Sequence, residues 1–211
     1  MTGVDYLLLS LVWIGWCALH SFMIARFILE ACENRLHNLY KYHRLFYNIV
    51  SVITFAAAGL YTRSLPETVI FGFSGAWDLV RVIVFIGAVL LFVGGVLSYD
   101  MLQFSGLRQI FSNTTHRVLT STGEFKTDGL LRITRHPWYL AGICLIWSSS
   151  KTISDIDLIA KVIFTLYFFI GAILEERKLI WQFGDQYKHY QKEVSMLFPF
   201  KWVFKSMRGK M

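Results

Sequence analysis

The sequence predicts an all-α integral membrane protein with about five transmembrane helices, and three observations agree on this class. Hydrophobic residues make up 55% of the 211 residues, and the mean hydropathy of +0.48 is above that of soluble domains. Several uncharged runs approach the roughly 20 apolar residues that a helix needs to cross a bilayer core of about 30 Å. Basic residues are concentrated between and after these runs.

The three longest uncharged runs predict the first three spans, at Tyr6–Ala25, Leu45–Thr62 and Val82–Tyr99. Two shorter runs, Pro137–Ser150 and Val162–Leu174, flank a polar turn and predict a hairpin as the last two membrane helices. Each is short for crossing a bilayer unaided, so a spanning and a re-entrant hairpin both stay open. No basic segment precedes the first run and no cleavage site follows it, so we expect the first span to be retained.

The segment after the hairpin predicts a cytoplasmic amphipathic helix near the C-terminus. Its apolar residues recur every three or four positions, at Ile180, Phe183, Tyr187, Tyr190 and Val194. This spacing is one face of a helix, and one interpretation is a helix that lies on the membrane surface. Gly184 interrupts the pattern at a cost in helix propensity, which indicates close packing or a kink.

The distribution of basic residues predicts the orientation of the chain in the membrane. Of the 21 Lys and Arg residues, 17 fall in the first loop, in the loop before the hairpin, and in the C-terminal tail. The positive-inside rule therefore places the N-terminus outside and the C-terminus in the cytoplasm, as in a bacterial inner membrane. The net charge of +7 reflects this bias and favours anionic membrane lipids as partners; no nucleic acid is expected.

Histidine and cysteine spacing predicts no metal site and no disulfide. The six histidines form no His-x-x-x-His pair, and the three cysteines follow no pairing motif. His20 lies in the first predicted span beside Ser21. It is interpreted either as one partner of an interhelical hydrogen bond or as a contact to substrate.

Two pairs of charged residues at the ends of the hairpin suggest a ligand site. Arg135 and His136 precede Pro137, at a predicted helix N-terminus, where cations are disfavoured, so an anionic ligand would satisfy them. Glu175 and Glu176 lie at the end of the last run. They are either solvated interfacial charges or include one carboxylate that binds a cation or hydroxyl groups. A zwitterionic ligand that carries a carboxylate, an ammonium group and a ribose would suit both pairs.

Two motifs carry a resemblance to a known family. The sequence Arg-His-Pro-Trp-Tyr at 135–139 with Gly142, followed by Glu175-Glu176, Phe183-Gly184, Tyr187, Tyr190 and Pro199, resembles the isoprenylcysteine carboxyl methyltransferase and phospholipid methyltransferase superfamily. The stretches 104–109 and 125–132, with His20-Ser21, look closest to its methanethiol S-methyltransferase and NnrU-like branch. Two departures are Ser195, where the family usually has proline, and a shorter N-terminal part.

The resemblance implies an S-adenosylmethionine-dependent membrane methyltransferase. It implies one domain, 1–211, with 1–98 as a transmembrane scaffold and 99–199 as the cofactor-binding catalytic part. Residues that would line the cofactor are His136, Pro137, Tyr139, Gly142, Glu175 or Glu176, Tyr187 and Tyr190. The chain has no Gly-x-Gly-x-x-Gly motif after a strand, so a soluble Rossmann cofactor site is not expected.

The function implied is methyl transfer to a small thiol such as methanethiol, or to a lipophilic substrate that enters from the membrane. Arg135, Glu176 and Arg108 are the candidate catalytic residues, since a guanidinium near a thiol lowers its pKa. Candidate substrate contacts are His20, Gln109 and Trp147. The alternatives are methylation of an isoprenylcysteine carboxylate or a lipid, an NADPH-dependent membrane reductase, and a non-catalytic NnrU-like accessory protein. The oligomeric state stays open.

Overall fold

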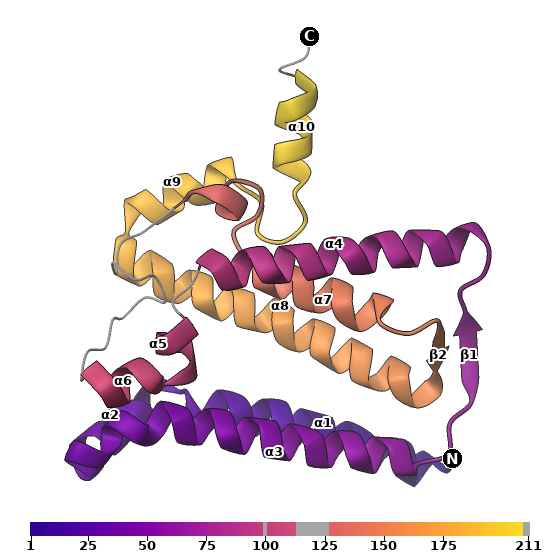
Figure 1. The fold of residues 1–211 in the computed structure, drawn as a ribbon, viewed down its shortest axis with the longest axis horizontal. Helices are drawn as coiled ribbons and strands as arrows, with labels where there is room; N and C mark the ends of the chain where they lie inside the picture. Colours follow the sequence, from indigo (N-terminus) through magenta and orange to yellow (C-terminus); the bar gives the residue numbers. More distant parts are fainter. Residues whose placement is uncertain (99–100, 113–126, 209–211) are drawn as a thin grey trace. The chain divides into compact units, whose positions relative to one another are not determined.

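The computed structural model describes residues 1–98, 101–112 and 127–208, which are almost entirely helical (Figure 1). The α-helices are α1 (Gly3–Met23), α2 (Arg26–Leu36), α3 (His43–Ser64), α4 (Ala76–Ser98), α5 (Met101–Ser105), α6 (Leu107–Ser112), α7 (Pro137–Ser148), α8 (Asp155–Phe183), α9 (Asp185–Glu193) and α10 (Phe200–Arg208). Two 3-10 turns, η1 (His37–Tyr42) and η2 (Gly129–Arg132), and two paired strands, β1 (Val69–Gly72) and β2 (Thr152–Ser154), complete the described elements.

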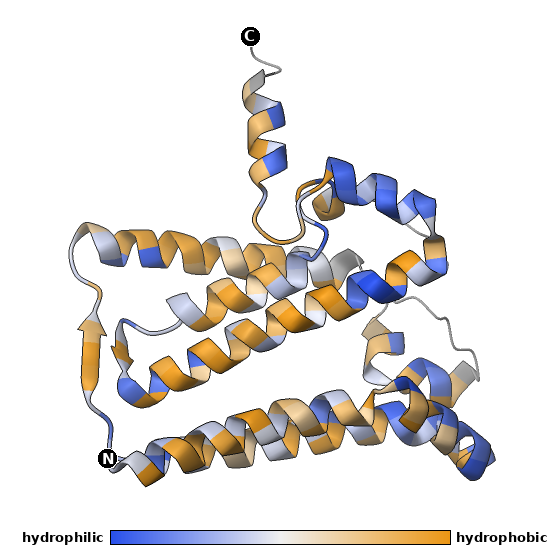
Figure 2. Cartoon of the chain, turned by 180° about the vertical axis from the view of Figure 1, so that it is seen from behind, coloured by the Kyte–Doolittle hydropathy of each residue, from blue (hydrophilic) through white to orange (hydrophobic). Residues whose placement is uncertain are grey.

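The prediction of an all-α membrane protein is confirmed. Four helical segments are long and apolar enough to cross a bilayer, namely α1, the stretch Arg26–Ser64 that contains α3, α4 and α8. Figure 2 shows their apolar colouring, in contrast to the hydrophilic α9. The exact number of spans stays a prediction, because α7 has only 12 residues.

The second arm of the hairpin is longer than the sequence predicted. The expected run Val162–Leu174 is the middle of α8, which has 29 residues. At 1.5 Å per residue this helix extends about 44 Å, more than a bilayer core. The predicted run ended where charged residues begin, but those residues continue the helix at both ends. Asp155 and Asp157 lie in its first turn, where negative charge is favourable.

The described residues divide into two compact units. In the first unit, which includes Met1–Phe71, α1 packs against α3 through aromatic side chains. Trp16 meets Phe55 edge-on with ring centroids 5.2 Å apart. Thr2 and Asp5 form a capping box at the start of α1. The Asn48 side-chain amide donates to the carbonyls of Phe104 and Ser105, each at 3.1 Å. The predicted single domain with its 98/99 boundary stays a prediction.

The second unit contains α4, α7, most of α8, α9 and α10. Glycines let its membrane helices approach closely: a Cβ at Gly95 would lie 1.9 Å from the Trp138 ring, and one at Gly142 would lie 2.9 Å from Phe168. Close approach at small residues is how helices associate where lipid removes the hydrophobic driving force. The α4–α7–α8 packing therefore depends on these two positions.

The predicted interruption at Gly184 is a sharp break between α8 and α9. Gly184 has φ +57° and ψ −129°, a conformation that other residues adopt only with strain, and a Cβ there would meet nothing within 4 Å. The turn, and not close packing, requires the glycine. The break folds Tyr187, Tyr190 and Val194 onto Leu131, Leu179, Ile180 and Phe183. The apolar stripe is thus buried inside the unit, and its interpretation as a membrane-surface face was wrong.

We expect Gly95→Ala to destabilise the second unit by about 1–3 kcal/mol, because its methyl group would overlap the Trp138 indole in a packed interface. Gly87→Ala in the same helix is the matched control, since a Cβ there meets nothing within 4 Å. Thermal unfolding of both variants in detergent measures the difference. A transition of Gly95→Ala at the temperature of Gly87→Ala would contradict the close approach.

Candidate functional site

The candidate site of the second unit is built on the segment that precedes α7. Thr134 bridges to Ser195, the Arg135 amide donates to the Ser195 carbonyl at 2.9 Å, and the His136 amide donates to the Met196 carbonyl at 3.1 Å. The helix then begins at Pro137, whose missing N–H is no loss in a first turn. These backbone bonds fix the positions from which the Arg135 and His136 side chains extend.

A buried ion pair between Arg135 and Glu176 is the centre of the site. The Arg135 Nε donates to Glu176 Oε1 at 2.5 Å, and the side chains are only 8% and 12% exposed. The same guanidinium donates through one terminal nitrogen to the carbonyls of Gln191 and Val194, at 3.0 and 2.5 Å. The sequence suggested an anionic ligand for Arg135, but the Glu176 carboxylate of the protein itself pairs with this guanidinium.

Three further donors surround the Glu176 carboxylate. His136 Nε2 lies 3.3 Å from Oε1, the Tyr187 hydroxyl donates to Oε1 at 3.3 Å, and Gln191 Nε2 donates to Oε2 at 2.8 Å. Donation by His136 places the ring proton on Nε2. With both oxygens engaged, Glu176 is suited to hold α7, α8 and α9 together and not to bind a ligand.

The Tyr187 hydroxyl stays protonated at ordinary pH. Burial raises the pKa of Tyr187 well above its usual range, and the negative charge of Glu176 raises it further. Its neighbour Tyr190 is also buried and donates to the Leu131 carbonyl at 2.5 Å. Both tyrosines act as fixed hydrogen-bond donors that attach α9 to the rest of the unit.

Glu175 differs from Glu176 in being accessible. Its side chain is 41% exposed, and its Oε2 lies 3.7 Å from His136 Nδ1. One residue of helix rotation, about 100°, thus separates a buried structural carboxylate from one that can meet a ligand. Of the two glutamates that the sequence left open, Glu176 is the buried one, and Glu175 is the better candidate for ligand contact.

Two other predicted residues extend the site along α7, and a third is structural. The Tyr139 ring meets His136 edge-on at 5.5 Å between centroids and packs beside Gly171. Gly142 permits the close contact with Phe168. Trp147 donates from its indole to the Thr165 hydroxyl at 2.9 Å, which joins α7 to α8.

The remaining predicted residues lie in the first unit. His20 is hydrogen-bonded to the Tyr47 hydroxyl at 2.5 Å and to the Ser51 hydroxyl at 3.1 Å, which is the interhelical bond that the sequence suggested. Gln109 donates to the Gln103 carbonyl at 3.2 Å, and Arg108 is partly buried. The structure does not place His20, Arg108 or Gln109 in the Arg135–Glu176 site.

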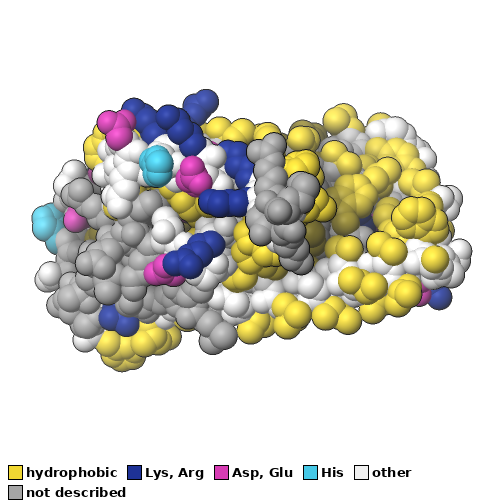
Figure 3. All heavy atoms as spheres, turned by 90° about the horizontal axis from the view of Figure 1, so that it is seen from above, with side chains coloured by type: hydrophobic (Ala, Val, Ile, Leu, Met, Phe, Trp, Pro, Cys, Tyr) yellow, Lys and Arg dark blue, Asp and Glu magenta, His cyan; other side chains and the backbone are white. Residues whose placement is uncertain are grey.

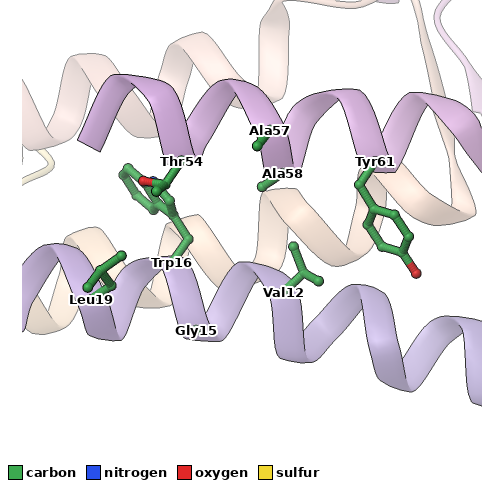
Figure 4. A pocket seen from close by; sticks show the side chains of 8 residues that line it. All are labelled: Val12, Gly15, Trp16, Leu19, Thr54, Ala57, Ala58 and Tyr61. Carbon is green, nitrogen blue, oxygen red and sulfur yellow. The ribbon is translucent and has the colours of Figure 1, made fainter. Parts of the chain in front are cut away.

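A shallow apolar pocket of about 350 Å³ lies between α1 and α3 in the first unit (Figure 4). Figure 4 shows Thr54, Ala58 and Tyr61 of α3 facing Val12 and Trp16 of α1. The lining is mainly hydrocarbon, with no charged residue. It suits an apolar group and offers no chemistry for a reaction.

A larger groove of about 520 Å³, lined by both charged and apolar side chains, lies beside the candidate site in the second unit. This volume is within the range of small-molecule sites. Its lining residues come from η2, α9 and α10 and the segments beside them: Thr127, Arg132, Gln186, His189, Tyr190, Glu193, Val194, Trp202 and Lys205. Of these residues, only Tyr190 was predicted from the sequence as a site residue.

The chain belongs to the family described as Protein of unknown function (DUF1295), which it matches over residues 3–194. It is similar to methanethiol S-methyltransferase 1 of Bradyrhizobium diazoefficiens, at 37% identity over 117 residues, 56% of this chain and 40% of that protein. It is 38% identical over 77 residues to the methanethiol S-methyltransferase of Pseudomonas deceptionensis, covering 36% of this chain and 29% of that protein.

A third relative is the methanethiol S-methyltransferase of Mycobacterium tuberculosis, at 34% identity over 97 residues, 46% of this chain and 39% of that protein. The matched parts therefore span less than half the length of these relatives. No solved structure matches the chain. The matches confirm the resemblance to the membrane methyltransferase branch.

We expect Glu176→Gln to destabilise the protein by about 1.5–3 kcal/mol, because it removes a charge-assisted bond and leaves the buried Arg135 guanidinium without its counter-charge. Glu175→Gln is the matched control, since its carboxylate is partly exposed. Thermal unfolding in detergent compares the two. Equal losses in both variants would contradict the structural assignment of Glu176.

Proposed function

We propose that this protein transfers a methyl group from S-adenosylmethionine to a small thiol of the methanethiol type at the cytoplasmic face of the membrane. The observation that carries the proposal is the Arg135–His136–Glu176–Tyr187 cluster. These are the motif residues that resemble the membrane methyltransferases, and they come from three separate segments of the chain. The similarity to methanethiol S-methyltransferases supports the choice of substrate class.

The residues beside this cluster fit the cofactor. S-adenosylmethionine carries a carboxylate, an ammonium group, a ribose and an adenine ring. Glu175 presents an accessible carboxylate for the ammonium group or the ribose hydroxyls. In the adjoining groove, Arg132 and Lys205 suit a carboxylate, and Trp202 offers an aromatic face for the adenine or the sulfonium. Arg135 and Glu176 would act as positioning residues, since they engage each other.

The cofactor would supply an activated methyl group to the thiolate sulfur, and S-adenosylhomocysteine would be the leaving group. Before that transfer, the protein must let the thiol proton leave to solvent, align the thiolate with the methyl group and exclude water. Arg108, which lies in the first unit, stays a candidate from the sequence alone for lowering the thiol pKa. Lipid and isoprenylcysteine substrates remain alternatives that the same cofactor chemistry would serve.

Purified protein in lipid nanodiscs should bind labelled S-adenosylmethionine in preference to NADPH and form dimethyl sulfide from methanethiol. His136→Ala removes a side chain that touches both glutamates, so we expect a loss of about ten- to a hundredfold in turnover, the equivalent of one charge-assisted hydrogen bond. His43→Ala in α3 is the control. Cofactor binding without product would favour a non-catalytic accessory protein, and NADPH binding would favour a reductase.

The proposed cytoplasmic site requires a cytoplasmic C-terminus. Reporter fusions at Gly3 and after Met211 should report opposite compartments, with the N-terminus outside, because 17 of the 21 basic residues lie in the segments assigned to the cytoplasm. Reporters that are active in one shared compartment would contradict an odd number of spans.

A further inference from the structure

The last helix carries an exposed apolar face. Phe200, Val203, Phe204 and Met207 of α10 follow the spacing of one helical face and are 64%, 37%, 63% and 61% exposed. The sequence stripe that suggested a membrane-surface helix lies further upstream and is buried. The apolar face of α10 is therefore exposed, whereas the upstream apolar stripe is packed inside the unit.

The opposite side of α10 is attached to α9. Trp202 and Lys205 line the groove toward α9, and helical rotation of about 100° per residue places them across the helix from Phe200 and Met207. Lys201 Nζ donates to the carbonyls of Gln191 and Lys192 at 2.9 and 2.8 Å. The helix is thus held on its polar side, which leaves the apolar side facing outward.

The direction of α10 is that of a helix in a membrane plane. Figure 1 shows α10 running across the direction of α4 and not beside it, and both helices belong to the second unit. Because α4 is long and apolar enough to cross a bilayer, a helix that runs across it is oriented parallel to the bilayer plane.

The charge around α10 complements anionic lipid. Between Asp185 and Met211 the sequence contains six Lys or Arg residues and two acidic residues. Figure 3 shows basic side chains gathered over α9, next to the start of α10. Basic residues beside an apolar helix face are typical of helices that bind negatively charged membrane surfaces.

We propose that α10 docks by its Phe200–Met207 face on the surface of an anionic phospholipid bilayer, with the basic residues of α9 and α10 at the lipid headgroups. The docked helix holds the end of α9 through Lys201, and the same Gln191 that accepts from Lys201 donates to Glu176. Membrane lipid thereby supports the candidate site from outside. The docking does not depend on the proposed methyl-transfer activity.

The test places a photo-crosslinking phenylalanine analogue at position 204, at 207, or at 206 on the other side of the helix, in the full-length protein. Nanodiscs contain phosphatidylcholine alone or an equal mixture with phosphatidylglycerol, and intact mass identifies what is crosslinked. We expect phospholipid adducts at 204 and 207 in the mixed nanodiscs and severalfold less adduct at 206. Raising NaCl from about 0.1 to about 1 M, which shortens the Debye length from about 10 to about 3 Å, should reduce the yield.

Charge reversal supplies the matched comparison. Lys192→Glu should lower the adduct yield at 204 severalfold, whereas Arg63→Glu, an equal change in charge in α3 of the first unit, should leave it unchanged. Equal adducts at 204 and 206, or equal yields with and without phosphatidylglycerol, would overturn the proposal. A crosslink from 204 to a second copy of the chain would overturn it too, and would assign the face to a dimer contact.

Discussion

The second unit depends on one buried interaction, the ion pair between Arg135 and Glu176. Removing two charges from water is expensive, and their attraction compensates only when further hydrogen bonds complete the geometry. Here the carboxylate also has His136, Tyr187 and Gln191 as partners, and the guanidinium donates to two backbone carbonyls. Because these groups come from the start of α7, from α8 and from α9, the pair fixes three segments in one arrangement.

The length of α8 makes this arrangement possible. The helix continues for seven residues beyond Glu176 to Phe183, so the two glutamates are not at its C-terminal end, where the dipole would oppose them. The left-handed turn at Gly184 then reverses the chain and returns Tyr187, Tyr190 and Gln191 to the same carboxylate region. The glycine of the Phe183-Gly184 motif thus decides, through its backbone conformation, which polar groups meet.

The family relationship and the geometry support each other at the level of the site. The residues that resemble membrane methyltransferases include those that form the ion pair and its partners, so the motif specifies a framework as much as a set of ligand contacts. Arg135 and Glu176 maintain the framework, while Glu175 is partly exposed beside His136 and the groove adjoins them.

The sequence by itself determined the class of the protein, the first three membrane helices and the identity of the polar motif residues. Hydropathy over about 20 residues and local motifs carry this information. Only the tertiary structure decided that Glu176 is buried and Glu175 accessible, and that the apolar stripe at 180–194 faces inward. It also decided that Gln191 donates to Glu176 and that Trp202 lines the groove. These outcomes depend on the rotation of α8 and the turn at Gly184, which bring together residues that are distant in the chain, and no local pattern encodes such distances.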